Sequence, residues 1–216
     1  MKSTSASELP VSDDSCKEAA ASPSSSPPED LQPWKNFRAG NRQAFVLLYY
    51  QHIDALYHYG ERLSPDKALI EDCLQDLFAE LWTRQAQLPE VTTVKFYLFK
   101  ALKRKIVKKQ GQRPSLLSSS EPEGYDFKIV FPPEFELATY DVPHHQHPEL
   151  LSAINQLTPR QKEAITLRFY DNFSYDEIAE IMSLSSRSVY NLTYRALAVL
   201  RRVLASTQSD GALSDR

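Results

Sequence analysis

The clearest pattern of apolar and polar positions lies in residues 174–202, where two helical repeats are separated only by the segment 183–185. Apolar residues recur at three- and four-residue steps, which places them on one face of each helix. Ser174 and Glu177 have the spacing of a capping box at the start of the first helix. Ser185 is positioned to cap the second. The pattern predicts a helix-turn-helix.

The second of these helices has a polar face of basic, amide and phenol side chains. They are Arg187, Tyr190, Asn191, Tyr194, Arg195 and Arg201. Such groups can contact base edges and phosphates in a major groove. An exposed face of an ordinary helical hairpin has the same pattern, so this stretch alone leaves both readings open.

Three further helices are predicted in the first half of the chain. Residues 41–63 carry aromatic and aliphatic side chains at helical spacing, and Ser64-Pro65 is expected to cap and open a helix that runs to about Arg84. That helix has paired apolar residues at every fourth position, from Leu69 to Trp82. Such pairs predict one broad buried stripe.

The opposite face of the helix after Ser64 is acidic over three turns. It carries Glu71, Asp72, Gln75, Asp76 and Glu80. A solvated face usually mixes bases with its acids, so this one suits docking against a basic partner, although a plain solvated face remains open.

The helix over residues 94–109 is basic. Its expected outward side chains are Lys100, Lys103, Arg104, Lys105, Lys108 and Lys109. Basic charge beside aromatic residues can hold a nucleic-acid backbone while bases stack. A lysine-rich surface helix is the alternative.

The sequence as a whole predicts an all-α protein of two small helical domains joined by a flexible linker, the second containing the helix-turn-helix. The expected boundaries are a disordered leader (1–33), a first domain (34–110), an acidic linker (111–147), a second domain (148–204) and a frayed tail (205–216). The leader is rich in Ser, Pro and acids, a composition that buries little.

The net charge of −3 is unevenly distributed. The predicted first domain has 13 basic and eight acidic residues, whereas the leader and the linker each have two basic and six acidic residues. Acidic segments beside a basic domain would weaken non-specific binding of phosphates by the free protein.

The residues give no support for a catalytic site or for a bound cofactor or metal. Cys16 and Cys73 have no paired spacing, and the histidines 144, 145 and 147 have no acidic or cysteine partner in ligand spacing. No His, Cys or carboxylate set has catalytic spacing. The expectation is a cytoplasmic protein that is not an enzyme, with neither cofactor nor metal and no insertion into the membrane.

Taken together, the two halves resemble the extracytoplasmic-function (ECF) sigma factors, the bacterial subunits that give RNA polymerase its promoter. The resemblance rests on four segments in a fixed order: IEDCLQDLFAELW, KFYLFKALKRK, LTPRQKEAITLRFYDNFSYDEIAEIM and SVYNLTYRAL. The last of these and the YDFKIVF segment resemble the Bacteroidetes-type members.

The resemblance implies a transcription initiation factor with core RNA polymerase (its clamp and flap surfaces) and promoter DNA as partners, and it leaves room for an anti-sigma factor. The implied sites are, for polymerase, Asp72, Gln75, Asp76 and Glu80; for the minus-ten element, Lys100, Lys103 and Arg104; for the minus-thirty-five element, Arg187, Tyr190, Asn191, Tyr194 and Arg195.

Two positions depart from the family pattern. Lys103-Arg104 stands where Arg-Asn is usual, and Ser183 stands where a turn glycine is common. If Ser183 needs a positive φ, the serine is strained by roughly 1 kcal/mol. Two alternatives therefore stay open: a helix-turn-helix regulator that acts without being a polymerase subunit, and a sigma-like decoy.

Overall fold

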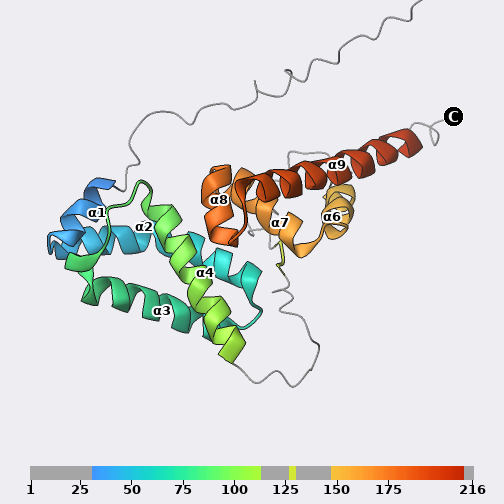
Figure 1. Ribbon diagram of the computed structural model, residues 1–216. Helices are drawn as coiled ribbons and strands as arrows, with labels where there is room; N and C mark the ends of the chain where they lie inside the picture. Colours follow the sequence, from blue (N-terminus) through green and yellow to red (C-terminus); the bar gives the residue numbers. More distant parts are fainter. Residues whose placement is uncertain (1–30, 113–126, 130–146, 212–216) are drawn as a thin grey trace, which may run out of the picture.

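The structure is a computed structural model that describes residues 31–112, 127–129 and 147–211. Within these ranges every regular element is helical, which confirms the predicted all-α fold (Figure 1). The elements are, in chain order, α1 (Leu31–Arg38), α2 (Arg42–Leu63), α3 (Lys67–Thr83), η1 (Gln85–Gln87), α4 (Val94–Gln112), α6 (His147–Asn155), α7 (Pro159–Ile165), η3 (Thr166–Tyr170), α8 (Tyr175–Met182) and α9 (Ser186–Gly211). In the described part, no helix is both long and apolar enough to cross a membrane.

Helices α1 to α4 form the first group and pack around one apolar core (Figure 1). The paired apolar positions of α3 lie on that core from Leu69 to Leu81, as predicted. Trp82 is the exception, because its side chain is 41% exposed. It lies at the edge of the core, where its ring contacts Phe37 of α1 and Phe45 of α2.

The start of α3 differs from the predicted cap. Asp66, not Ser64, is the N-cap, and its side chain accepts a hydrogen bond from the backbone N–H of Leu69. Ser64 instead ends α2, and its hydroxyl accepts from the N–H of Asp66. Serine and aspartate both cap helices well, so local pattern alone did not separate two candidates two residues apart.

Helices α6 to α9 form the second group. The predicted capping box is confirmed at Ser174 with Glu177, and a second capping box joins Thr158 with Gln161 at the start of α7. Ser185 accepts a hydrogen bond from the N–H of Ser188 and so caps α9 as predicted. Helices α8 and α9 contact each other across a short turn and form the helix-turn-helix (Figure 1).

The helices extend beyond four of the predicted boundaries. Helix α1 begins at Leu31, inside the segment predicted as leader, and α9 runs to Gly211, inside the predicted tail. Helix α4 runs to Gln112 and α6 begins at His147, both inside the predicted linker. Residues 1–30, most of the linker (113–126 and 130–146) and residues 212–216 lie outside the described part.

The two groups lie against each other. Helix α4 contacts α8, and one continuous apolar cluster contains buried residues of both groups. Phe127, a residue of the predicted linker, is fully buried in that cluster. The arrangement of α4 therefore depends on segments about 60 to 80 residues away in the sequence.

Gly60 allows the close approach of α2 to α3. A Cβ atom added there would lie 2.6 Å from Cγ2 of Ile70, which is fully buried. We expect Gly60→Ala to lower the free energy of unfolding by about 1 to 3 kcal/mol through overpacking, measured by urea denaturation. Gly111→Ala, in a helix but with nothing within 4 Å, is the matched control and should raise it by up to about 1 kcal/mol. Equal free energies for the two variants would contradict this account.

Candidate functional site

The acidic face of α3 is exposed, as the sequence predicted. Side chains of Asp72, Asp76 and Glu80 are 70%, 56% and 43% exposed, respectively. Gln75, between them on the same face, is also exposed. These four residues, here called the α3 acidic face, present carboxylates and an amide to solvent over three turns of helix.

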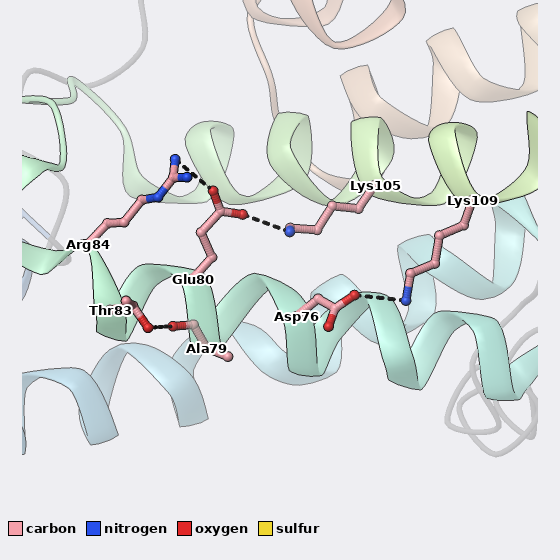
Figure 2. A network of polar contacts seen from close by, with 7 residues as sticks. All are labelled: Asp76, Ala79, Glu80, Thr83, Arg84, Lys105 and Lys109. Atoms are coloured by element: carbon pink, nitrogen blue, oxygen red, sulfur yellow. Dashed lines mark hydrogen bonds and ion pairs between the residues drawn. The ribbon is translucent and has the colours of Figure 1, made fainter. Parts of the chain in front are cut away.

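Basic side chains of α4 lie along the edge of this face (Figure 2). Lys109 Nζ is 2.8 Å from Asp76 Oδ2, and Lys105 Nζ is 2.8 Å from Glu80 Oε2. Arg84, one turn beyond Glu80, lies 3.0 Å from its other oxygen. The acidic face therefore carries part of its own counter-charge.

These ion pairs shift the pKa of the groups involved. Hydrogen bonding to Lys109 lowers the pKa of Asp76, hydrogen bonding to Lys105 lowers that of Glu80, and the Asp76 carboxylate raises the pKa of Lys109. Because the pairs are largely solvated, each adds little to stability. A partner that offers cations of its own can therefore replace Lys105 and Lys109 in these ion pairs at small cost in free energy.

A groove of about 590 Å³ lies between α3, the segment after η1 and α4. Its walls combine the cations Arg84, Lys100 and Arg104 with the rings of Phe96 and Tyr97. Lys100 Nζ lies 5.4 Å from the centre of the Phe96 ring, and burial raises the pKa of Tyr97. Two of the three predicted minus-ten residues, Lys100 and Arg104, thus line one basic and aromatic groove.

The third residue, Lys103, is buried, although the sequence predicted that it would face outward. Its side chain is only 9% exposed, and its Nζ donates a hydrogen bond of 2.7 Å to Oε1 of Glu163, which is fully buried. Desolvation lowers the pKa of Lys103, opposed by the Glu163 charge. The prediction failed because the second group packs on this side of α4. Within the apolar stripe of α4, Lys103 lies four residues after Phe99 and three before Ile106, and that spacing is the signal that could have indicated burial.

The predicted minus-thirty-five residues all lie on the exposed face of α9. They are Arg187, Tyr190, Asn191, Tyr194 and Arg195. The Tyr190 ring packs edge to face on Tyr175 of α8, with centroids 5.7 Å apart. Ser186, at the start of α9, donates a hydrogen bond of 2.5 Å to Asp176 of α8. Helix α8 thus fixes the start of α9 and one ring of its exposed face.

Sequence reasoning missed Asp171, a buried carboxylate between the two groups. Its Oδ2 is 3.6 Å from Arg62 of α2, and its Oδ1 is 3.9 Å from Lys95 of α4. Within the described part, Oδ2 accepts no hydrogen bond. Desolvation therefore outweighs both cations and raises the pKa of Asp171 to about 6. No local pattern indicated this site, because its partners are distant in sequence.

Comparison with known proteins finds similarity to sigma factors. A family model for sigma-70 region 4 matches residues 147–200, from α6 into α9. Over 176 residues, 77% of this chain and 62% of the relative, the sequence is 26% identical to the ECF RNA polymerase sigma factor BldN of Streptomyces coelicolor. It is also 26% identical to the ECF sigma factor SigX of Bacillus subtilis, over 74% of this chain and 83% of the relative. Both relatives are ECF RNA polymerase sigma factors, and the chain is similar to them over about three quarters of its length.

Two solved structures share the helical fold. The sigma factor RpoE from Bartonella quintana, solved with the anti-sigma factor NepR, matches with a TM-score of 0.53 and 24% identity, over 74% of this chain and 96% of that one. CnrH, solved with the cytosolic domain of CnrY, matches with a TM-score of 0.53 and 21% identity, over 82% and 97%. The exposed α9 residues lie within the region-4 match.

The turn between α8 and α9 has a strained residue. Ser183 has φ 55° and ψ 45°, the left-handed conformation that the sequence analysis considered. We expect Ser183→Gly to raise the free energy of unfolding by about 0.5 to 1 kcal/mol, measured by urea denaturation, because glycine adopts this conformation without strain. Ser152→Gly, the same change at an exposed right-handed position in α6, should lower it instead. A loss of stability from Ser183→Gly would contradict the strain.

Asp171 predicts a specific pH dependence. A carboxyl group whose pKa is raised from 3.8 to about 6 binds its proton more tightly in the folded protein than in the unfolded chain. The free energy of unfolding should therefore rise by roughly 1 to 3 kcal/mol as pH falls from about 7 to about 4. Asp76 and Glu80, whose pKa values are lowered, begin to lose their contributions as pH falls below about 5, which opposes the rise at the acidic end of this range. Asp171→Asn should abolish the rise, measured by denaturation at several pH values; an unchanged slope would show that another group titrates.

Proposed function

We propose that this ECF sigma factor binds core RNA polymerase and directs it to specific promoters as a transcription initiation factor. The observation that carries the proposal is that one chain of this family presents two chemically distinct exposed surfaces. The α3 acidic face suits a basic protein surface, and the exposed face of α9 suits DNA. The protein is a binding subunit and not an enzyme.

The polymerase contact is assigned to the α3 acidic face, that is, to Asp72, Gln75, Asp76 and Glu80. Its carboxylates are exposed and only partly neutralised by Lys105 and Lys109. A basic surface of the polymerase clamp would replace those lysines as the ion-pair partners of the carboxylates. The second group would contact the polymerase flap, as the family resemblance implies.

The DNA contacts divide between the two groups. In the minus-thirty-five contact, Arg187 and Arg195 would bind phosphates and base edges, while Tyr190, Asn191 and Tyr194 supply rings and an amide for bases. In the minus-ten contact, Lys100 and Arg104 would hold the backbone, and the aromatic walls of the groove beside them would accept an unstacked base. Lys103 would contribute to this contact only if its ion pair with Glu163 were broken.

The proposed organisation is a first domain (34–110), an acidic linker (111–147) and a second domain (148–204), with a leader and a tail on either side. We place the chain among Bacteroidetes-type ECF sigma factors on its SVYNLTYRAL segment. Its partners would be core polymerase, promoter DNA and an anti-sigma factor, because the similar fold of RpoE has been solved with such a factor. A protein that binds polymerase and DNA would act in the cytoplasm.

A sigma-like decoy is the second candidate. The observation that favours it is the burial of Lys103, which removes one expected minus-ten contact from the surface. A decoy would occupy polymerase without starting transcripts.

The test combines co-purification with transcription. We expect the purified chain to bind core polymerase and to start transcripts from a library of templates with randomised upstream sequence, at sites that share a motif. Asp72→Arg with Asp76→Arg should abolish both, because it reverses the charge of the docking face. Binding to core polymerase that inhibits transcription and yields no transcripts would establish the decoy. Tight sequence-specific binding to DNA in the absence of polymerase would establish an autonomous regulator.

The control separates docking from internal packing. Lys109→Met breaks the same Asp76 ion pair but leaves both acids in place, so it should keep polymerase binding. Loss of binding in Lys109→Met, or retained binding in the double arginine variant with a native circular-dichroism spectrum, would contradict the assignment.

A further inference from the structure

The segment that joins η1 to α4, residues 88–93, is here called the groove loop because it contributes to the wall of the basic and aromatic groove. Its Pro89 lines the groove, as do Phe96 and Tyr97 of α4. Residues 89–92 form no backbone–backbone hydrogen bond with any described part of the chain. The position of the groove loop is therefore set by side chains from elsewhere in the fold.

Helix α1 supplies side chains that hold the groove loop. Trp34, which is only 2% exposed, donates a hydrogen bond of 3.1 Å from its Nε1 to the backbone carbonyl of Pro89. Arg38, one turn later in α1, forms an ion pair of 3.4 Å between its Nη1 and Oε1 of Glu90. Residues four positions apart lie on the same face of a helix. One face of α1 therefore holds two consecutive residues of the loop.

Trp34 also contacts the α4 side of the groove. Its ring packs at a tilt on the ring of Tyr97, with centroids 5.4 Å apart. Trp34 is not one of the described residues that line the groove. It therefore supports two parts of the wall, the carbonyl of Pro89 and the ring of Tyr97, from behind.

Helix α1 is itself fixed to the core of the first group. Phe37 is 1% exposed, and its ring centroid lies 5.1 Å from that of Phe45 in α2 and 6.4 Å from that of Trp82 in α3. Gly40, just after the helix, has φ 94° and donates its N–H to the carbonyl of Phe37, which ends α1 and directs the chain into α2. The support behind the groove is thus rigidly connected to α2 and α3.

A groove gains affinity from an unstacked base only to the extent that its walls are already in place. Taking a base out of its stack costs free energy, and stacking on an aromatic ring offsets that cost. Walls that must first be ordered reduce the gain, because ordering loops and side chains opposes binding.

We propose that Trp34 and Arg38 are positioning residues for base capture: from behind the groove, they hold the groove loop and the Tyr97 ring as two preformed walls for an unstacked base of single-stranded DNA. This inference rests on the proposed function, whose minus-ten contact it deepens. It gives α1 a role in reading DNA although α1 does not touch the DNA.

The test separates base capture from phosphate binding in the full chain at low salt. Two fluorescein-labelled single-stranded oligonucleotides of equal length are compared, one of mixed sequence and one made only of abasic sites. Lys100 and Arg104 attract the phosphates of both probes, whereas only the first probe has bases that can stack in the groove. The wild type should bind the mixed-sequence probe about 10-fold more tightly than the abasic probe.

Trp34→Phe keeps an aromatic ring and removes the N–H donor. It should reduce the preference for bases from about 10-fold to about 2-fold and leave affinity for the abasic probe nearly unchanged. Backbone amides of the groove loop should exchange hydrogen faster. Trp82→Phe, at the exposed edge of the same core, is the matched control and should keep the full preference. A merely structural role would weaken the binding of both probes alike.

A second variant keeps the test decisive if Trp34→Phe does not fold. Benzothienylalanine in place of Trp34 retains both fused rings and removes only the N–H donor, and it should reduce the preference in the same direction.

Arg38 is tested by its charge. Arg38→Met breaks the ion pair with Glu90 and should lower the preference by about 2-fold, a modest effect because Glu90 is largely exposed. Arg38→Lys keeps a cation at this position and should restore the preference. Lys35→Met removes the same charge from an exposed position of α1 and is the control for weaker attraction of phosphates.

Three outcomes would overturn the positioning role. They are a full preference for bases in both Trp34 variants, an equal loss of preference in Trp82→Phe, and a wild type that binds the two probes equally. The proposed function fails separately. A chain that loses its preference in Trp34→Phe but never binds core polymerase would keep the positioning role and refute the function. A chain that starts transcripts while both Trp34 variants behave as the wild type would keep the function and refute the positioning role.

Discussion

The buried carboxylate of Glu163 is the group on which the arrangement of the two helical groups depends. A charge without water is stable only when its partners are in place, and here they are Lys103 and Tyr59, on α4 and α2. Satisfying Glu163 therefore requires the second group to lie on the first. The same requirement orients η3, and with it Asp171, toward Arg62 and Lys95. Rings around these charges exclude water and strengthen the electrostatic contacts inside.

The ion pairs of the α3 acidic face obey different physics. Asp76 and Glu80 are largely solvated, so their pairs with Lys109 and Lys105 are screened and exchange easily. The same kind of chemistry, lysine on carboxylate, thus holds the molecule closed in one place and leaves a surface ready for a partner in another.

Local structure was largely predictable from the sequence, because helix patterns and caps involve residues three or four positions apart. The capping box at Ser174, the helix-turn-helix and the exposed face of α9 are all confirmed. The errors were also physical. Ser64 and Asp66 are both good caps, and only the connection between α2 and α3 selects Asp66. Lys103 was predicted to face solvent because lysine usually does, yet a carboxylate 60 residues away covers it.

The sequence by itself determined that the chain is helical, where its apolar stripes lie, and which faces carry acids, bases and rings. The family resemblance added the expected partners, since the order of the motifs resembles that of the ECF sigma factors. Only the tertiary structure decided which polar side chains are buried, which lysines of α4 are engaged, and that Asp171 lies between two cations. The physical reason is that periodicity reports how a residue is oriented about its own helix axis. Which distant segment covers that side depends on packing between helices, and no local pattern records it.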